Sequence, residues 1–123
     1  GMVRTFQITQ PFATLNTLEN IMVGAYSNTS DKNIAQLNAE RVADILGMTS
    51  LLYQTADGLT VAARKRLELA RALATNPKLL LLDEVMAGLN PTEIDEIVEV
   101  IKGIRDNGVT IFLIEHVMKA VVN

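Results

Sequence analysis

The stretch that decides the fold is Leu79-Leu80-Leu81-Leu82-Asp83-Glu84, four leucines followed directly by two carboxylates. Four leucines are too few to cross a membrane and do not alternate with polar residues, so they predict a strand buried on both faces of a parallel sheet. Open α/β sheets deliver ligand-binding residues at the carboxyl ends of their strands. Asp83 is suited to hold a hydrated Mg²⁺, and Glu84 to orient or deprotonate a water molecule. A buried strand that ends in ordinary surface acids has the same pattern, so this stretch alone leaves both interpretations open.

The composition is that of a soluble globular protein and excludes several classes. The chain has 123 residues, of which 49% are hydrophobic and 20% charged, which is typical of one domain. A net charge of −3 argues against a general nucleic-acid binder, which carries a basic excess. The absence of cysteine excludes a disulfide framework and a thiolate metal site, and it fits a reducing cytoplasm. No apolar run approaches the roughly 20 residues of a membrane span, and the first residues lack the apolar segment of a signal peptide.

The second half of the chain alternates between strand and helix patterns. Asn90 is the expected N-cap of a helix that begins at Pro91. Residues 109–114 predict a second buried strand, which ends in Glu115 and His116. Residues 117–122 begin a further amphipathic helix. The order strand–helix–strand predicts a right-handed crossover with parallel strands, so the two polar strand ends are expected to lie close together.

Two such strands are too few for a complete doubly wound sheet. We therefore expect exposed sheet edges and exposed apolar faces on residues 79–82 and 109–114. Such surfaces pair with other chains, which predicts self-association, as a homodimer that uses this surface.

The first half is mainly helical. After a short strand at residues 3–7, helices are predicted at about residues 17–26, 33–46 and 60–75. In the second helix the predicted apolar stripe is Ile34, Leu37, Val42, Ile45 and Leu46.

The third of these helices has a clear start and a predicted packing face. Thr60 is its expected N-cap, and Leu67 and Leu73 belong to the packing face. Its basic residues are interpreted as a solvated face with some ion pairs, because the chain as a whole is acidic; they are Arg64, Lys65, Arg66 and Arg71.

In their order along the chain, these motifs resemble the nucleotide-binding subunit of ATP-binding-cassette (ABC) transporters, over nearly the whole sequence. The matching segments are Phe6-Gln7 for the Q-loop, residues 59–73 for the signature segment and its helix, residues 79–84 for the Walker B strand with its catalytic glutamate, residues 87–90 for the D-loop, and residues 114–116 for the switch histidine. The local sequence is most similar to branched-chain amino-acid importers, as in Leu18-Glu19-Asn20, Gly88-Leu89-Asn90-Pro91 and Ile114-Glu115-His116.

The resemblance implies a role for each matching residue. Asp83 would hold Mg²⁺ through water, and Glu84 would polarise the attacking water. His116 would contact and sense the γ-phosphate of ATP, and Gln7 would join the shell of Mg²⁺ and water and couple it to the membrane subunit. These roles suit phosphoryl transfer, because positioning and charge neutralisation supply most of its catalysis.

The resemblance also implies partners. Residues 8–26 would line the groove that receives the coupling helix of a transmembrane permease, and a second ATP-binding subunit would complete the assembly. The implied nucleotide-binding residues of the signature and D-loop are Thr60, Val61, Ala62, Ala63, Gly88 and Asn90. The subunit would lie in the cytoplasm, peripheral on the inner face of the cell membrane, and no nucleic-acid partner is expected.

Three departures from the family pattern change what is expected of this chain. No glycine is followed by Lys and Ser or Thr, so the Walker A motif that cradles the phosphates is missing. Because that motif precedes the Q-loop in the family, we expect a C-terminal part of the domain, without ATPase activity and without tight binding of ATP or Mg²⁺. Val61 and Ala62 stand where the signature has two glycines, and Ala63 where it has Gln. Asn90 replaces the usual D-loop Asp, and Val85 replaces a usual Pro.

The expected fold is therefore α/β, an incomplete P-loop NTPase domain of the ABC ATPase type. Residues 1–10 are assigned to the Q-loop region, residues 11–75 to a helical subdomain with the signature helix, and residues 76–123 to the C-terminal parallel strands and helices of the core. The expected function is a fragment of the ATP-binding, ATP-hydrolysing subunit of an importer for branched-chain or other amino acids. Two alternatives stay open: a non-catalytic truncated cassette that acts as an interaction module, and an ABC-type ATPase outside transport.

Overall fold

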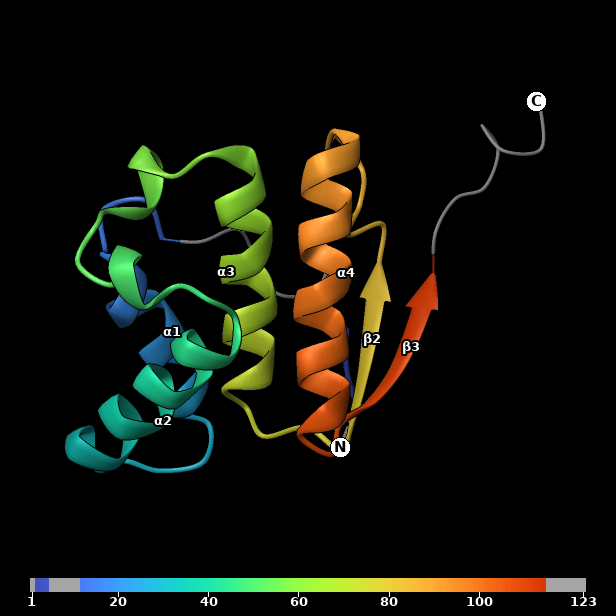
Figure 1. Cartoon of the computed structure of the whole chain (residues 1–123). Helices are drawn as coiled ribbons and strands as arrows, with labels where there is room; N and C mark the ends of the chain where they lie inside the picture. The colour runs from blue at the N-terminus through green and yellow to red at the C-terminus, as the bar shows by residue number, and fades with distance from the viewer. Residues whose placement is uncertain (1, 5–11, 115–123) are drawn as a thin grey trace.

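The structure, a computed structural model, describes residues 2–4 and 12–114 of the chain. Its sheet has three parallel strands in the order β1-β2-β3, with β1 at Met2–Arg4, β2 at Leu79–Asp83 and β3 at Thr110–Ile114 (Figure 1). β2 is the middle strand, and its Leu80 aligns with Val3 on one side and Ile111 on the other. The predicted parallel pairing of the leucine strand with the second strand is confirmed. The strand predicted at residues 3–7 is confirmed only as far as Arg4, because its remainder lies outside the described residues.

The two apolar strands are buried less completely than their sequences predict. In β2, Leu80 and Leu82 are fully buried, whereas Leu79 and Leu81 on the alternate face are only partly buried. In β3, 59% of Phe112 and 44% of Leu113 is exposed. The prediction that both strands are buried on both faces is therefore wrong. The exposure expected of an incomplete sheet is found at Phe112 and Leu113, but not at Leu80, Leu82 or Val109, which are buried. The reason is that the described residues cover only one side of the sheet and that β3 is paired on one edge only among them.

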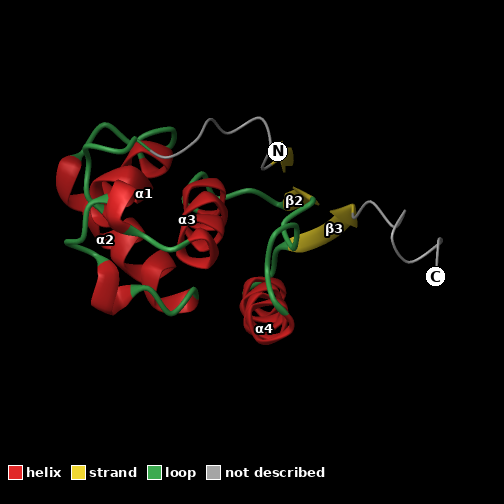
Figure 2. Cartoon of the chain, turned by 90° about the horizontal axis from the view of Figure 1, so that it is seen from above, coloured by secondary structure: helices red, strands yellow, loops and turns green. Residues whose placement is uncertain are grey.

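Helix α4, at Pro91–Asp106, connects β2 to β3 and lies on one side of the sheet (Figure 2). Its buried face is formed by Ile97, Val100 and Ile104. Asn90 caps its start and Asn107 its end, and Gly108, with a φ of 91°, then turns the chain into β3. Among the described residues, no helix covers the opposite side of the sheet (Figure 2).

The other three helices form a separate group, called the helical group below. It contains α1 at Thr17–Ala25, α2 at Lys32–Ile45 and α3 at Val61–Leu73, with short 3₁₀ turns at Thr49–Leu51 and Ala56–Gly58 between α2 and α3. Its fully buried side chains include Ile21, Leu46, Met48, Leu67 and Leu69. None of the described helices has both the length and the apolar character that a membrane span requires.

Helices α1 and α3 approach closely at Gly24. A Cβ placed on Gly24 would overlap the carbonyl oxygen of Arg71 and lie 3.3 Å from the Cβ of Ala74. Only glycine allows this approach, which brings the backbone of α1 against the end of α3.

The packing face of α2 differs from the predicted apolar stripe. Ala35, Ala39 and Ala43 are fully buried together with Val42, whereas 54% of Ile34 and 68% of Leu37 is exposed. Small side chains at four-residue spacing let α2 lie close to its neighbours, so the branched residues of the neighbouring positions point to solvent. The stripe was therefore predicted correctly at Val42 and Leu46 and wrongly at Ile34 and Leu37.

Candidate functional site

The two carboxylates of the leucine strand lie where β2 ends beside the end of β3. Asp83 is the last residue of β2 and aligns with Ile114, the last residue of β3. The N–H of Glu84 donates to the carbonyl oxygen of Ile114 at 2.8 Å. Asp83 is partly buried and Glu84 is exposed. The hydrogen bond therefore fixes the backbone that carries both carboxylates relative to the end of β3.

Glu84 has an unusual backbone conformation. Its φ of 54° lies in the left-handed region, and besides Asn76 it is the one non-glycine residue with positive φ in the described part of the chain. Asparagine tolerates this region, whereas glutamate is strained there by roughly 1–2 kcal/mol. The turn is held by the hydrogen bond to Ile114 and by the burial of Val85 behind it. Strain of this kind is common at functional sites.

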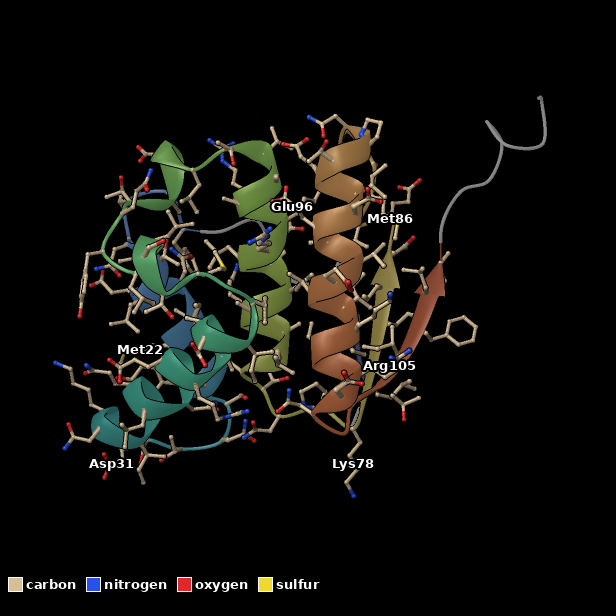
Figure 3. All side chains as sticks on the ribbon, in the orientation of Figure 1. Met22, Asp31, Lys78, Met86, Glu96 and Arg105 are labelled. Atoms are coloured by element: carbon tan, nitrogen blue, oxygen red, sulfur yellow. The ribbon has the colours of Figure 1, made fainter. Side chains whose placement is uncertain are left out.

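The starts of two helices lie at the same end of the molecule as these strand ends. Both α3 and α4 run antiparallel to the strands, so their N-termini are at the top of Figure 1, where β2 and β3 also end. Arg66 of α3 and Glu96 of α4 form an ion pair at 3.8 Å, and Figure 3 shows Glu96 on the side of α4 toward α3. This end of the molecule thus gathers the strand carboxylates and two helix N-termini, which carry partial positive charge.

The residues of the altered signature form the first turn of α3. The hydroxyl oxygen of Thr60 accepts a hydrogen bond from the N–H of Ala63 at 3.1 Å and so caps the helix, as predicted. The side chain of Val61 is 58% exposed, and Ala62 is partly buried. The bulk of Val61 therefore creates no clash within this chain, and it would matter only to a group that approaches from outside.

The D-loop residues Gly88 and Asn90 lie between β2 and α4. Gly88 has φ of 79°, and a Cβ placed on it would meet no atom within 4 Å. The side-chain oxygen of Asn90 accepts from the N–H of Glu93 at 2.8 Å, and the Glu93 carboxylate accepts from the N–H of Asn90 at 3.0 Å. This capping box satisfies two N–H groups at the start of α4. The side chain of Asn90 is therefore committed to starting the helix.

The structure brings together only part of the predicted site. Asp83 and Glu84 are adjacent, and Thr60 to Ala63 belong to the helical group on a different element. Gln7 and His116 lie outside the described residues, as does the helix predicted at residues 117–122.

Sequence reasoning missed the role of Arg71. It was predicted on a solvated basic face, but only 6% of Arg71 is exposed, and its guanidinium lies 5.2 Å from the centre of the Phe12 ring. Burial lowers the pKa of Arg71, and the nearby Glu68 opposes that shift. Burial raises the pKa of Glu68, which Lys65 and Arg71 counteract. The position of Arg71, four residues after the buried Leu67, was the signal that placed it on the packing face.

Sequence reasoning also missed Asn20. This side chain is fully buried, and its oxygen accepts from the N–H of Phe12 at 2.7 Å. Its nitrogen donates to the carbonyl oxygens of Phe12 at 3.1 Å and of Asn16 at 2.9 Å. One carboxamide thus satisfies both backbone groups of Phe12, where the described chain resumes after residue 11. A buried asparagine inside an apolar helix face is a signal for such a role.

The carboxylates present suit one part of a magnesium–nucleotide site. Mg²⁺ keeps several waters and is usually held by one or two carboxylates together with substrate phosphates, which the pair Asp83 and Glu84 can supply. The described residues contain no cluster of three or more potential metal ligands, so a cage made by protein alone is not found among them. The phosphate-cradling motif does not occur in the sequence. The residues present therefore suit the binding of Mg²⁺, but they do not include the motif that binds the phosphates.

Comparison with known proteins identifies the architecture. Residues 1–87 match the protein family described as ABC transporter. This chain belongs to the ABC transporter family. Among curated relatives, the high-affinity branched-chain amino acid transport ATP-binding protein BraF of Pseudomonas aeruginosa is 34% identical over 139 residues, covering 100% of this chain and 54% of BraF. LivG of Escherichia coli K12, which has the same descriptive name, is 39% identical over 137 residues, covering 98% of this chain and 54% of LivG.

Solved ABC structures have the same fold. The structure of MJ1267, an ATP-binding cassette of an ABC transporter, matches with a TM-score of 0.80 and 30% identity, over 100% of this chain and 54% of MJ1267. The predicted class, an incomplete P-loop NTPase domain of the ABC type, is confirmed. The chain spans about half the length of the curated relatives it matches.

Proposed function

We propose that this chain is part of the ATP-binding subunit of an ABC importer, and that the whole subunit couples ATP hydrolysis to the uptake of branched-chain or other amino acids. The observation that carries the proposal is the position of Asp83 and Glu84 at the end of β2. There the N–H of Glu84 donates a hydrogen bond to Ile114 at the end of β3. The similarity to BraF and LivG, both named for branched-chain amino acid transport, supports the choice of substrate. On this proposal residues 11–75 are the helical subdomain and residues 76–123 belong to the core.

Four residues carry the chemistry on this proposal. When bound, Mg²⁺-ATP supplies the phosphoryl group that water attacks. Asp83 would hold the metal through water, and Glu84 would polarise the attacking water from its position in the turn after β2. His116 would contact the γ-phosphate, and Gln7 would join the metal and water shell. The roles of His116 and Gln7 rest on their match to the family motifs, since both residues lie outside the described part of the chain.

A second ATP-binding subunit is proposed to contact the starts of α3 and α4. Thr60, Val61, Ala62 and Ala63 present the first turn of α3, where N–H groups suit a phosphate. Gly88 and Asn90 flank the start of α4 beside it. The exposed Val61 side chain leaves less room for a phosphate at this turn than glycine would. The altered signature is therefore proposed to bind the nucleotide more weakly than a signature with two glycines.

The transmembrane permease is proposed to dock near residues 8–26. In the described part of that segment, three large apolar side chains are substantially exposed: Phe12 at 46%, Val23 at 40% and Tyr26 at 44%. Asn20 hydrogen-bonds to the backbone of Phe12, and the guanidinium of Arg71 lies 5.2 Å from the centre of its ring, so Phe12 is held in place. Such a subunit lies in the cytoplasm, peripheral on the inner face of the cell membrane.

The proposal is tested by a chimera in which this chain replaces the matching half of Escherichia coli LivG. We expect the chimera to restore branched-chain amino-acid uptake and ATPase activity in the reassembled transporter. Glu84→Gln should abolish the ATPase activity, and Asp95→Asn, an exposed acid on α4, is the matched control. Activity that is insensitive to Glu84→Gln would refute the assignment.

The isolated chain is proposed to be inactive, because it lacks the lysine and the N–H groups of a phosphate cradle. Calorimetry with Mg²⁺-ATP should show no saturable binding in the micromolar range. Micromolar binding that Asp83→Asn removes would contradict this statement.

A second candidate function is a non-catalytic interaction module, favoured by the exposed Phe112 and Leu113 of β3. It predicts that the chain folds stably without nucleotide and self-associates through the open side of the sheet. Light scattering should then give a dimer mass that Phe112→Ser reduces toward the monomer. A monomer at high concentration would count against this candidate.

A further inference from the structure

A pocket of about 220 Å³ lies at the junction between the helical group and the sheet. Its polar lining residues are Arg41 of α2, Asn76 and Lys78 of the segment between α3 and β2, and Asn107 after α4. Leu73 and Pro77 line its apolar part. Since a water molecule takes about 30 Å³, the pocket has room for several waters or one phosphate group. Figure 3 shows Lys78 at the lower end of the molecule, opposite the end that carries Met86.

The pocket is lined by two cations and by no carboxylate. Arg41 donates to the side-chain oxygens of Asn38 at 2.9 Å and of Asn76 at 3.5 Å, which orient its guanidinium at the rim. Within the described part of the chain, neither Arg41 nor Lys78 forms an ion pair. Asp106, which precedes the lining residue Asn107, forms an exposed ion pair with Arg105 at 3.5 Å and is not among the lining residues.

The usual structural explanation for such cations is the C-terminal end of a helix, and both α3 and α4 end here. Their last carbonyls, however, already have other donors. The carbonyl oxygen of Ala74 accepts from Asn38 at 3.0 Å, and that of Gly103 accepts from Asn107 at 2.8 Å. The side chain of Thr75 donates to Ala72 at 2.6 Å. Hydrogen bonding at these helix ends therefore does not require Arg41 or Lys78. Their two full positive charges also exceed the partial negative charge of about one half that each helix end carries, so the pocket keeps a positive excess.

We infer that this pocket binds a small phosphate-type anion, held between Arg41 and Lys78. An Arg and a Lys on opposite elements suit such a group, because the guanidinium supplies directed donors and the ammonium a mobile point charge. The bound anion would bridge α2 of the helical group to the base of β2. This site lies away from Asp83 and Glu84 and does not depend on the function proposed above.

The test is a titration of the whole 123-residue chain with inorganic phosphate at fixed ionic strength, followed by amide NMR. We expect saturable shifts at Asn76, Lys78 and Gly108. Arg41→Gln and Lys78→Gln should each weaken binding by about tenfold, the effect of one charge-assisted hydrogen bond. Arg41→Lys should recover part of the affinity. Lys32→Gln, an exposed cation of α2 outside the pocket, is the matched control and should leave binding unchanged.

Pyrophosphate distinguishes the source of the anion. Tighter binding of pyrophosphate assigns the pocket to polyphosphate compounds, and weaker binding assigns it to monophosphates; both support the site. Shifts that chloride reproduces, or that Lys32→Gln reduces as strongly as Arg41→Gln, would overturn it. A lowered melting temperature in both pocket variants without any effect on phosphate titration would overturn it as well, because it would show that the cations only complement the helix ends.

Discussion

The helical group and the sheet differ in how completely they bury their apolar side chains. In the helical group Ile21, Leu46 and Leu67 are fully buried. In the sheet Leu82 is fully buried, but 59% of Phe112 is exposed on the neighbouring strand. The two regions share one continuous hydrophobic core, in which the helical group is well enclosed, whereas the described residues cover the sheet on one side only. Stability is expected to reside mainly in the helical group, and association mainly in the sheet.

Among the variants that test this difference, Leu67→Ala in the helical group is expected to change stability most. Removing a fully buried leucine side chain should lower the free energy of unfolding by about 2–5 kcal/mol, through lost burial and a cavity. Urea denaturation followed by circular dichroism measures it. Leu37→Ala, on the exposed side of α2, is the control and should change stability by less than about 0.5 kcal/mol. Equal losses in the two variants would contradict the assignment of the core.

The close approach of α1 and α3 can be tested at Gly24. Gly24→Ala should cost about 1–3 kcal/mol of unfolding free energy, because the new methyl overlaps the Arg71 carbonyl. Gly103→Ala is the matched control within α4, where the nearest atom to a new Cβ is the Ile45 carbonyl oxygen at 3.9 Å. That change should stabilise the chain by roughly 0.5–1 kcal/mol, since alanine favours helix. If both substitutions act in the same direction, the contact is not tight.

At the end of β2, Glu84→Gly should raise stability slightly. It relieves a positive φ, and the gain of about 1 kcal/mol is partly offset by the greater freedom of glycine in the unfolded chain. Thermal unfolding against Glu84→Ala separates backbone relief from loss of the carboxylate. A Gly variant no more stable than the Ala variant would show that the turn is unstrained.

The smallest stability effect is expected for Phe112→Ser on β3. Because most of this ring is exposed, the free energy of unfolding should change by less than about 1 kcal/mol. Solubility and mass at high concentration should change more, since an exposed apolar edge strand promotes association. A large loss of stability with unchanged mass would reverse the comparison between sheet and helical group.

Local signals in the sequence predicted the elements well, and tertiary context decided what they missed. Thr60 and Asn90 were identified as N-caps because polar residues precede apolar periodic runs, and both accept the expected hydrogen bonds. Burial was harder to predict. Ile34 is exposed because alanines make the close contact of α2, and Phe112 is exposed because the covering of a strand depends on other layers. The sequence pattern of a strand does not show whether another layer of the protein covers it.

The candidate site was likewise predictable only in part. Asp83 and Glu84 could be placed at a strand end from the sequence alone, since an apolar run and its following residues fix that position. The strained turn at Glu84 could not, because it depends on a hydrogen bond to Ile114 on another strand. The position of Asn20 in an apolar helix face was a signal for a structural role, but its partner Phe12 depends on the path of the segment before α1. The roles of Gln7 and His116 stay predictions.

The contact between Arg71 and Phe12 also has a spectroscopic consequence. The chain contains no tryptophan, so Phe12→Trp would introduce a single tryptophan next to a guanidinium that lies 5.2 Å from the present ring. The present residue is 46% exposed, so a partner that docks on the proposed surface would cover part of the new ring. The emission maximum of this tryptophan would then shift to shorter wavelength, which makes it an optical reporter of docking on the surface proposed to face the permease.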